Sequence, residues 1–324
     1  MIALRRRANR LAVVVAAALA CHAPTPREPL PAGVGADIAY LADPARQGRG
    51  VGSPGSAAAA RFIVSRYRAL ALDGAFAEEC AAPQVCPSTF FQPFMAEGTT
   101  ARNIVAVIHG ADSLLAGEYV LVGAHYDHLG VSPAFSNDQN LGVAVRPGAD
   151  DNASGTAAVL ELARRLAERP AARSILLVNF DAEEFGMLGS ALFVRYPPAA
   201  LDSIVLMLNL DMVGRLRRRD LLIDGSGAND ALRAMADSVA KSNAVRSVRW
   251  SGSIGRSDHA SFAAMHVPTI MLTSGEHTDY HRVTDLAARI DVKGLLRIVD
   301  VAEGIIRTVG ARGWMPPATT QAAP

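Results

Sequence analysis

The sequence has few cysteines, few aromatic residues and little net charge. Its 324 residues include three cysteines and two tryptophans, and the formal charge is +1. Because acids and bases nearly balance, the chain lacks the broad positive surface that nucleic acids or anionic membranes attract. Half of the residues are hydrophobic, which is enough for a full core, and we expect one large α/β domain.

Long hydrophobic runs are also missing. The apolar stretch from Leu11 to Ala20 is too short to span a bilayer comfortably as a permanent helix. It follows four arginines (Arg5, Arg6, Arg7 and Arg10), as in an export signal. We therefore expect residues 1–20 to be a signal peptide and the protein to be exported.

The residues before Cys21 leave two fates open for the mature chain. Ala18 and Ala20 form a signal-peptidase pattern, and Ala18-Leu19-Ala20-Cys21 also resembles the bacterial lipobox, in which the cysteine is lipidated. Plain secretion, periplasmic or otherwise, and a lipid anchor at Cys21 are both compatible with this pattern. A lipid anchor is the one membrane contact that we expect.

Removal or acylation of Cys21 leaves only Cys80 and Cys86. Two cysteines without nearby histidines are too few ligands for a closed structural zinc site. We expect a local disulfide between them, with zinc binding as the alternative.

Composition also predicts where the folded domain begins and ends. Residues 21–36 are rich in Pro, Ala and Gly and are expected to form a flexible tether. We expect the folded domain at 37–312 and a disordered tail at 313–324. Arg217–Arg219 next to Asp220 are interpreted as a solvated hairpin.

Apolar periodicity predicts alternating strands and helices. Helices are expected at Ser56–Leu72, Ala153–Glu168, Ala228–Ser242 and from the N-cap Asp291 to Val309; strands at Ile104–Ile108, Tyr119–Ala124, Ile175–Phe180, Ile204–Leu210, Leu221–Ile223 and Val267–Leu272; and a loop at Cys80–Pro93. Continuous apolar strands separated by amphipathic helices indicate an α/β fold, with a mostly parallel, twisted sheet covered by helices on both faces.

Polar side chains follow the predicted strands, where ligands of such sheets bind. They are His125 and Asp127, Asp181 to Glu184, and Asp211; loops add Asp150, Asp151, Tyr280 and His281. Imidazole and carboxylate without thiolate is the ligand set of a catalytic zinc or a related divalent ion. Carboxylates gathered at one edge would repel one another, and two divalent ions about 3.5–4 Å apart would remove that repulsion.

Five segments resemble, in order and spacing, the motifs of the M28 family of zinc aminopeptidases. They are GAHYDHLG, PGADDNASG, FDAEEFGMLGS, NLDMVGR and DYHRVTD, with weaker similarity in GRGVGSPGS and GRSDHASF. The similarity extends over about residues 61–309. It implies a single-domain zinc aminopeptidase fold, with no sign of the protease-associated domain inserted in some relatives.

The resemblance also implies a role for each matching residue. His125 and Asp211 would hold one zinc, Glu184 and His281 the other, and Asp151 would bridge the two. Glu183 would be the general base, which takes a proton from water and passes it to the leaving amine. Two further residues would support them: Asp127 as acceptor from the ring of His125, and Tyr280 as donor to the oxyanion.

Other histidines compete for these roles. His277 lies four positions before His281, and the YHRVTD pattern favours His281 by the resemblance. His128 is not assigned a role. Asp258 and His259 are interpreted as wall or structural residues. Taken alone, Asp150-Asp151 would be a helix cap and Glu183-Glu184 an exposed turn.

We therefore expect a hydrolase that acts on peptides with a free N-terminus, with two zinc ions or other divalent ions. Three alternatives are weaker. Glutaminyl cyclases share the fold but resemble a single-zinc version of this site, whereas His125 and Asp211 complete a second position. Related dizinc carboxypeptidases carry an inserted domain that this chain is too short to hold, and a pseudoenzyme would lack ligands that are present here.

Overall fold

The computed structural model describes residues 33–77, 88–96, 98–216, 220–225, 230–250 and 257–314. The predicted signal peptide, Cys21, the Cys80–Cys86 pair and the arginines at 217–219 lie outside these residues. No helix in the described part of the chain combines the length and the apolar character that crossing a bilayer requires.

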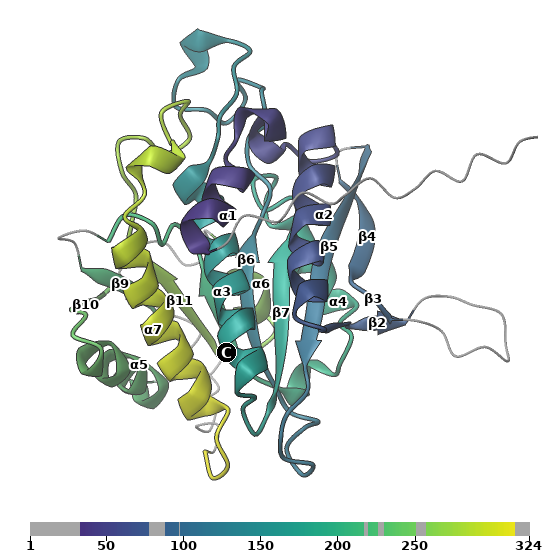
Figure 1. Cartoon of the computed structure of the whole chain (residues 1–324), viewed down its shortest axis with the longest axis vertical. Coiled ribbons are helices and arrows are strands. Elements are labelled where there is room, and N and C mark those ends of the chain that lie inside the picture. The colour runs from purple at the N-terminus through teal and green to yellow at the C-terminus, as the bar shows by residue number, and fades with distance from the viewer. Residues whose placement is uncertain are drawn as a thin grey trace, which may run out of the picture. The chain divides into compact units, whose positions relative to one another are not determined.

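A nine-stranded sheet forms the centre of the described domain (Figure 1). Its order is β1-β5-β7-β6-β8-β11-β9-β10, and β4 also pairs with β5. The strands are β1 Asp73–Gly74, β4 Phe91–Ala96, β5 Thr99–Ile108, β6 Tyr119–His125, β7 Ser174–Phe180, β8 Ile204–Leu210, β9 Leu221–Asp224, β10 Ser247–Arg249 and β11 Thr269–Thr273. A separate pair joins β2 (Phe76–Ala77) to β3 (Ser88–Thr89).

The central strands β7, β6, β8 and β11 run parallel, as the sequence predicted. Every residue of β7, β8 and β11 is buried, which agrees with their continuous apolar sequences. Antiparallel pairing occurs outside this centre, where β5 joins β7 and β9 joins β11. The α/β fold class is confirmed, and its parallel part is the part that carries the site.

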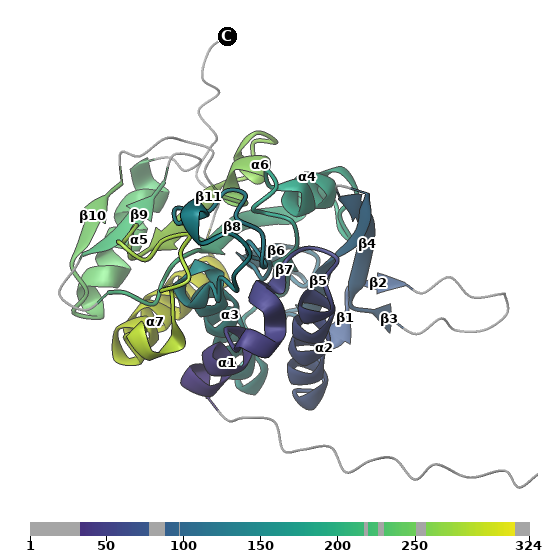
Figure 2. The same ribbon diagram turned by 90° about the horizontal axis from the view of Figure 1, so that it is seen from above.

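Helices cover both faces of the sheet (Figure 2). One face carries α1 (Val34–Leu41), α2 (Pro54–Ala69), α3 (Gly155–Glu168) and α7 (Val292–Val309); α5 (Asp230–Ser242) packs on α7; and the other face carries α4 (Leu188–Arg195) and α6 (His259–Ala263). The predicted cap of α7 is present, because the Asp291 carboxylate accepts a hydrogen bond from the Gly294 N–H.

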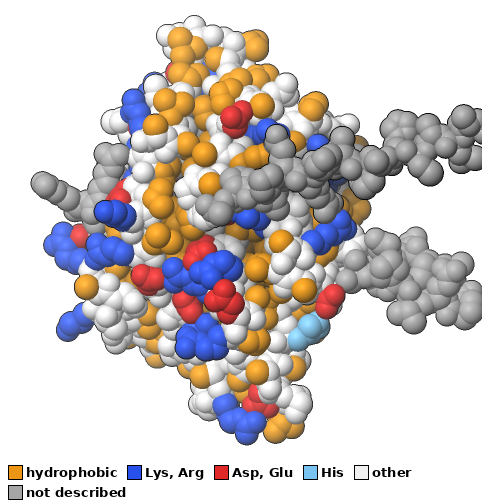
Figure 3. All heavy atoms as spheres, in the orientation of Figure 1, with side chains coloured by type: hydrophobic (Ala, Val, Ile, Leu, Met, Phe, Trp, Pro, Cys, Tyr) orange, Lys and Arg blue, Asp and Glu red, His pale blue; other side chains and the backbone are white. Residues whose placement is uncertain are grey.

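The outer side of α3 and α7 is charged, while their inner sides form the main core. Leu162 and Ile298 are fully buried, whereas Arg165 on α3 pairs with Asp300 and Glu303 on α7 at 2.7 and 3.1 Å. These charges gather over the two helices in Figure 3. Each helix is therefore amphipathic, which explains why apolar periodicity in the sequence predicted it.

Three boundaries predicted from the sequence need correction. Residues 34–36, assigned to the tether, are the first turn of α1, because Val34 and Ile38 pack into the core. Residues 88–93, assigned to a loop, belong to β3 and β4, since β4 pairs antiparallel with β5. The domain extends to Trp314, whose carbonyl accepts a hydrogen bond from the Arg173 guanidinium.

Candidate metal centre

The parallel strands deliver the predicted polar residues to one edge of the sheet. His125 is the last residue of β6, and Asp211 directly follows β8. Glu183 and Glu184 lie in the turn after β7, where Ala182 and Met187 adopt positive φ angles of 59° and 61°. The order β7-β6-β8 therefore places the three sets side by side.

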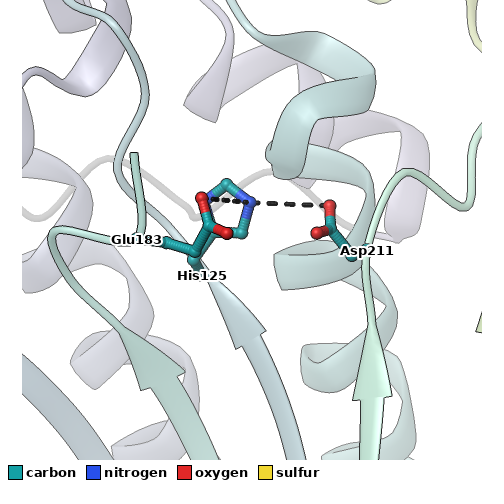
Figure 4. Close-up of side chains that lie close together, drawn as sticks. All are labelled: His125, Glu183 and Asp211. Carbon is teal, nitrogen blue, oxygen red and sulfur yellow. Dashed lines mark ion pairs between the residues drawn. The ribbon is translucent and has the colours of Figure 1, made fainter. Parts of the chain in front are cut away.

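The first group of ligand atoms surrounds the Nε2 atom of His125. This atom lies 3.3 Å from Asp151 Oδ1 and 3.5 Å from Asp211 Oδ1, and 3.9 Å from Glu183 Oε2. Figure 4 shows the His125 ring between Glu183 and Asp211. Two ligands bonded to one zinc ion at about 2.0–2.1 Å lie roughly 3.3 Å apart in a tetrahedron, so Asp151 and Asp211 each lie at ligand spacing from His125. Ligand atoms of His125, Glu183 and Asp211 lie within 4.8 Å of one another.

The second group surrounds the Nε2 atom of His281. This atom lies 3.1 Å from Asp151 Oδ2 and 3.1 Å from Glu184 Oε2. Asp151 thus turns one carboxylate oxygen to each group. The structure brings together all five residues that the resemblance suggested as ligands.

The hydrogen bonds of the two rings leave these Nε2 atoms available as ligands. The Nδ1 atom of His281 lies 2.9 Å from the Phe135 carbonyl; because a carbonyl only accepts, Nδ1 donates this hydrogen bond, and Nε2 is the ring atom that can bind a metal ion. The Nδ1 atom of His125 lies 3.5 Å from Asp127 Oδ1, which is too long for a hydrogen bond of good geometry, and this atom has no hydrogen-bond partner among the described residues.

The charges of the centre also call for cations. Carboxylates raise the pKa of both histidines: that of His125 rises well above its usual value despite burial, and that of His281, which burial alone would lower, rises to about 11. Two buried carboxylate oxygens, Asp151 Oδ2 and Asp211 Oδ1, have no hydrogen-bond partner among the described residues. Divalent ions would supply both the positive charge and the missing partners, so the donor set fits such ions.

Glu183 differs from the other acids of the centre. Burial raises its pKa well above the usual value; His125 opposes this rise, while the carboxylates of Glu184, Asp258 and Asp211 reinforce it. Its backbone N–H, like that of Glu184, donates a hydrogen bond to Asp127, at 3.1 and 3.3 Å. Asp127 therefore contacts the turn of Glu183 as well as the ring of His125.

Tyr280 stacks on the ring of His281, with the ring centroids 3.8 Å apart. It lines the cavity that the two groups of ligand atoms share. Apolar and neutral residues complete the lining: Met212, Trp250, Met271, Thr273 and Gly275, with Glu276 as a further acid.

The histidines that competed in the sequence lie elsewhere or in other roles. His277 Nε2 is 3.0 Å from Asp150 Oδ2, and His259 Nε2 is 3.3 Å from Asp224 Oδ2, so neither joins the two groups. His128, which we left without a role, lies in the centre: its Nδ1 atom is 2.7 Å from Glu184 Oε1. This contact occupies one oxygen of Glu184 and leaves the other facing His281.

Two buried residues to which the sequence assigned no role support the segment that carries Asp151. Asp285 accepts hydrogen bonds from the backbone N–H groups of Asp150 and Asp151 at 2.8 and 3.1 Å. The fully buried Arg49 donates to the carbonyls of Pro147 and Gly148 at 2.7 and 2.8 Å. Arg49 lies in the motif GRGVGSPGS and Asp285 in DYHRVTD. Their place in these motifs was the only feature of the sequence that pointed to them.

Comparison with known proteins adds a family and a fold. A model of peptidase family M28 matches residues 103–306. The uncharacterised protein YfbL of Escherichia coli K12 is 30% identical over 238 residues, which cover 63% of this chain and 69% of that protein. The chain spans only about a quarter of the length of the next three curated relatives.

Two solved structures show the same fold at low identity. The zinc aminopeptidase BSAP of Bacillus subtilis superposes with a TM-score of 0.68 at 17% identity, covering 89% of this chain and 98% of that one. A glutaminyl cyclase of Porphyromonas gingivalis gives 0.68 at 20% identity, covering 85% and 96%.

Proposed function

Because the chain belongs to peptidase family M28, we propose that it is an exported aminopeptidase that holds two zinc ions and removes the N-terminal residue of peptides. The match over residues 103–306 confirms the resemblance seen in the sequence. The family and the neighbouring structures support a zinc-dependent hydrolase; the number of ions, the N-terminal specificity and the export are our proposals.

One observation carries the proposal of two ions. The two carboxylate oxygens of Asp151 face two separate groups of ligand atoms, Oδ1 toward His125 and Oδ2 toward His281. One ion would be held by His125, Asp151 and Asp211, and the other by Asp151, Glu184 and His281. A carboxylate that bridges two ions is expected in this arrangement.

Ions bound there would polarise the scissile carbonyl and lower the pKa of a water molecule. Glu183 would take the proton from the attacking water and pass it to the leaving amine, a task that suits a carboxyl whose pKa is raised. Tyr280, which lines the same cavity, would donate a hydrogen bond to the carbonyl oxygen as it becomes negative. The surrounding carboxylates would bind the free α-amine of the substrate.

The glutaminyl cyclase fold is the main alternative, since a neighbour with that activity superposes equally well. His125 and Asp211 favour the peptidase, because both face Asp151 at ligand spacing and would complete a second metal position. Metal analysis of the purified protein separates the two: about two ions per chain support the peptidase, and one ion supports the cyclase.

A panel of aminoacyl amides, assayed with and without a chelator, tests the activity. We expect release of the free amino acid that stops on chelation and returns with zinc. The Glu183→Gln variant should retain its zinc and lose at least about a hundredfold in kcat/KM, the usual contribution of a general base. Near-normal activity in a zinc-loaded variant would exclude the mechanism.

Export and anchoring need a separate measurement. We propose cleavage after Ala20, with either a free or a lipidated Cys21, from the arginine-rich start and the short apolar run. Mass spectrometry of the mature N-terminus distinguishes these outcomes, and a chain that keeps residues 1–20 would contradict both.

A further inference from the structure

Apolar side chains are exposed beside the metal centre, in the loop between β6 and α3 that projects at the top of Figure 1. Five large hydrophobic side chains of this region remain at least 37% exposed: Val131, Phe135, Leu141, Val143 and Phe185. Exposed apolar side chains that contact one another next to a catalytic centre commonly mark a binding surface.

Two of these side chains form an aromatic pair attached to the proposed ligands. The rings of Phe135 and Phe185 meet edge to face, with centroids 6.0 Å apart and planes at 78°. Phe185 directly follows Glu184, and the Phe135 carbonyl accepts a hydrogen bond from His281 at 2.9 Å. We call this pair the aromatic rim. The peptide bond between Glu184 and Phe185 and the hydrogen bond between His281 and Phe135 hold it next to the proposed ligands.

The loop that carries Phe135 is held by polar contacts rather than by an apolar core. The fully buried guanidinium of Arg146 pairs with Asp138 at 2.9 Å and donates to the carbonyls of Ser132 and Ala144 at 3.0 and 2.9 Å. Asn137 donates to the backbone carbonyls of Tyr280 and His281, each at 3.0 Å. The rim is thus fixed before any substrate arrives, which reduces the entropy lost on binding.

Neither ring of the rim lines the cavity, but both are joined to residues that do. Glu184 directly precedes one of the two phenylalanines, and His281 donates to the carbonyl of the other; both Glu184 and His281 line the cavity. The apolar lining residues come from further along the sheet, because Met212 lies just after β8 and Met271 is in the middle of β11. A peptide whose N-terminal side chain contacted these methionines would extend past Glu184 and His281, where the rim lies.

We propose that the aromatic rim binds an apolar side chain of the residue immediately after the cleaved bond, so that the enzyme prefers peptides with an aromatic or aliphatic second residue. The inference rests on the proposed aminopeptidase function. It concerns the leaving part of the peptide, whereas the cavity receives the residue that is released.

Three substrates with the same N-terminal residue, X, test the inference, X being the residue cleaved best in the amide panel. They are X-Phe-Gly, X-Gly-Gly and the primary amide of X, which has nothing beyond the cleaved bond. For the unmodified zinc-loaded protein, kcat/KM should be about tenfold higher for X-Phe-Gly than for X-Gly-Gly, as expected for one additional aromatic contact.

The double variant Phe135→Ala/Phe185→Ala should reduce this ratio to within about twofold of one. Alanine keeps the Phe135 carbonyl and its hydrogen bond to His281. Because the readout is a ratio of two peptides, a general loss of turnover cancels. Leucine at both positions should restore part of the preference. Tyr196→Ala, which removes a 57% exposed aromatic side chain beyond the far end of α4, should leave the ratio unchanged.

Each remaining outcome is decisive. A ratio near one in the unmodified protein, or an unchanged ratio in the double variant, overturns the inference while hydrolysis of the primary amide still supports the aminopeptidase. No hydrolysis of any member of the amide panel, so that no X can be chosen, rejects the aminopeptidase itself. If the rim instead covers a second copy of the chain, the double variant shifts the molecular mass in size-exclusion chromatography without changing the ratio, and the inference fails.

Discussion

His125 and Asp211 are positioned by the sheet, whereas His281 reaches Asp151 from a loop beyond β11. We call His125 and Asp211 the strand half of the centre. There, β6 pairs in parallel with both β7 and β8, and the Thr156 hydroxyl donates to the His125 carbonyl at 2.9 Å. The backbone hydrogen bonds between these parallel strands form whenever the sheet forms. The strand half therefore has its geometry as soon as the domain is folded.

Glu184 and His281 form what we call the loop half of the centre. Their positions depend on contacts with individual side chains and loop carbonyls. His281 is oriented by the Phe135 carbonyl, and Glu184 by His128. The loop of Phe135 in turn depends on the buried pair of Arg146 and Asp138. If the centre holds the two proposed ions, a single substitution should therefore be able to weaken one ion position and leave the other intact.

The largest effect on activity is expected at Asp151, which faces both the strand half and the loop half. Asp151→Asn removes the charge that both ions share, so kcat/KM should fall by roughly a thousandfold or more, because even residues behind a ligand contribute about 10–100-fold. Metal analysis should show both positions weakened. Glu168→Gln, which removes a carboxylate with a 67% exposed side chain, serves as the control; loss of only one ion in Asp151→Asn would contradict the bridge.

The support of the loop half comes next. Arg146→Met leaves Asp138 buried without its partner, so the protein should be destabilised by about 3–5 kcal/mol, measured by chemical denaturation. Arg164→Met, whose guanidinium is 47% exposed, should cost less than about 1 kcal/mol. Equal effects in the two variants would show that the loop does not depend on its buried cation.

A smaller effect is expected from His128→Ala. Glu184 would lose the hydrogen bond on Oε1, and one of two ions should bind about 10–100-fold more weakly, while the ion of the strand half keeps its affinity. Titration with a competing chelator resolves the two steps. His109→Ala removes a histidine whose side chain is 72% exposed and should change neither; equal weakening of both steps would break the distinction between the halves.

The smallest effect concerns the exposed tip of the loop. Val143 is 81% exposed, so Val143→Ser should change the free energy of unfolding by less than about 0.5 kcal/mol. Val122→Ala, at a fully buried position of β6, should cost about 2 kcal/mol. A large loss of stability in Val143→Ser would show that the tip packs against the domain rather than facing solvent.

The sequence predicted the strand half well for a physical reason. Buried parallel strands are continuous apolar runs, and the first polar residue after such a run lies at the edge of the sheet. This reasoning predicted that His125 and Asp211 lie at that edge, which is where β6 and β8 end in the structure. It failed for β4, whose alternating and partly exposed residues gave no apolar run. It also missed α1 and α4, which are only eight residues long.

The residues of the loop half were harder to predict from strand periodicity. Residue type and spacing offered His277 and His281 as equivalent candidates, and only the family resemblance favoured His281. In the folded chain, His277 contacts Asp150 and His281 contacts Asp151. Nothing in the spacing of Arg49, Arg146 or Asp285 reveals which carbonyl or N–H group each one contacts.

The sequence by itself therefore determined the α/β class, the central strands and the imidazole and carboxylate chemistry at their ends, because these follow from short-range periodicity. The tertiary structure alone decided which oxygen of Asp151 faces which histidine, how His128 restrains Glu184, and where Phe135 meets Phe185. Those contacts join residues that are far apart in the chain, and only the packing of the folded loops brings them within bonding distance.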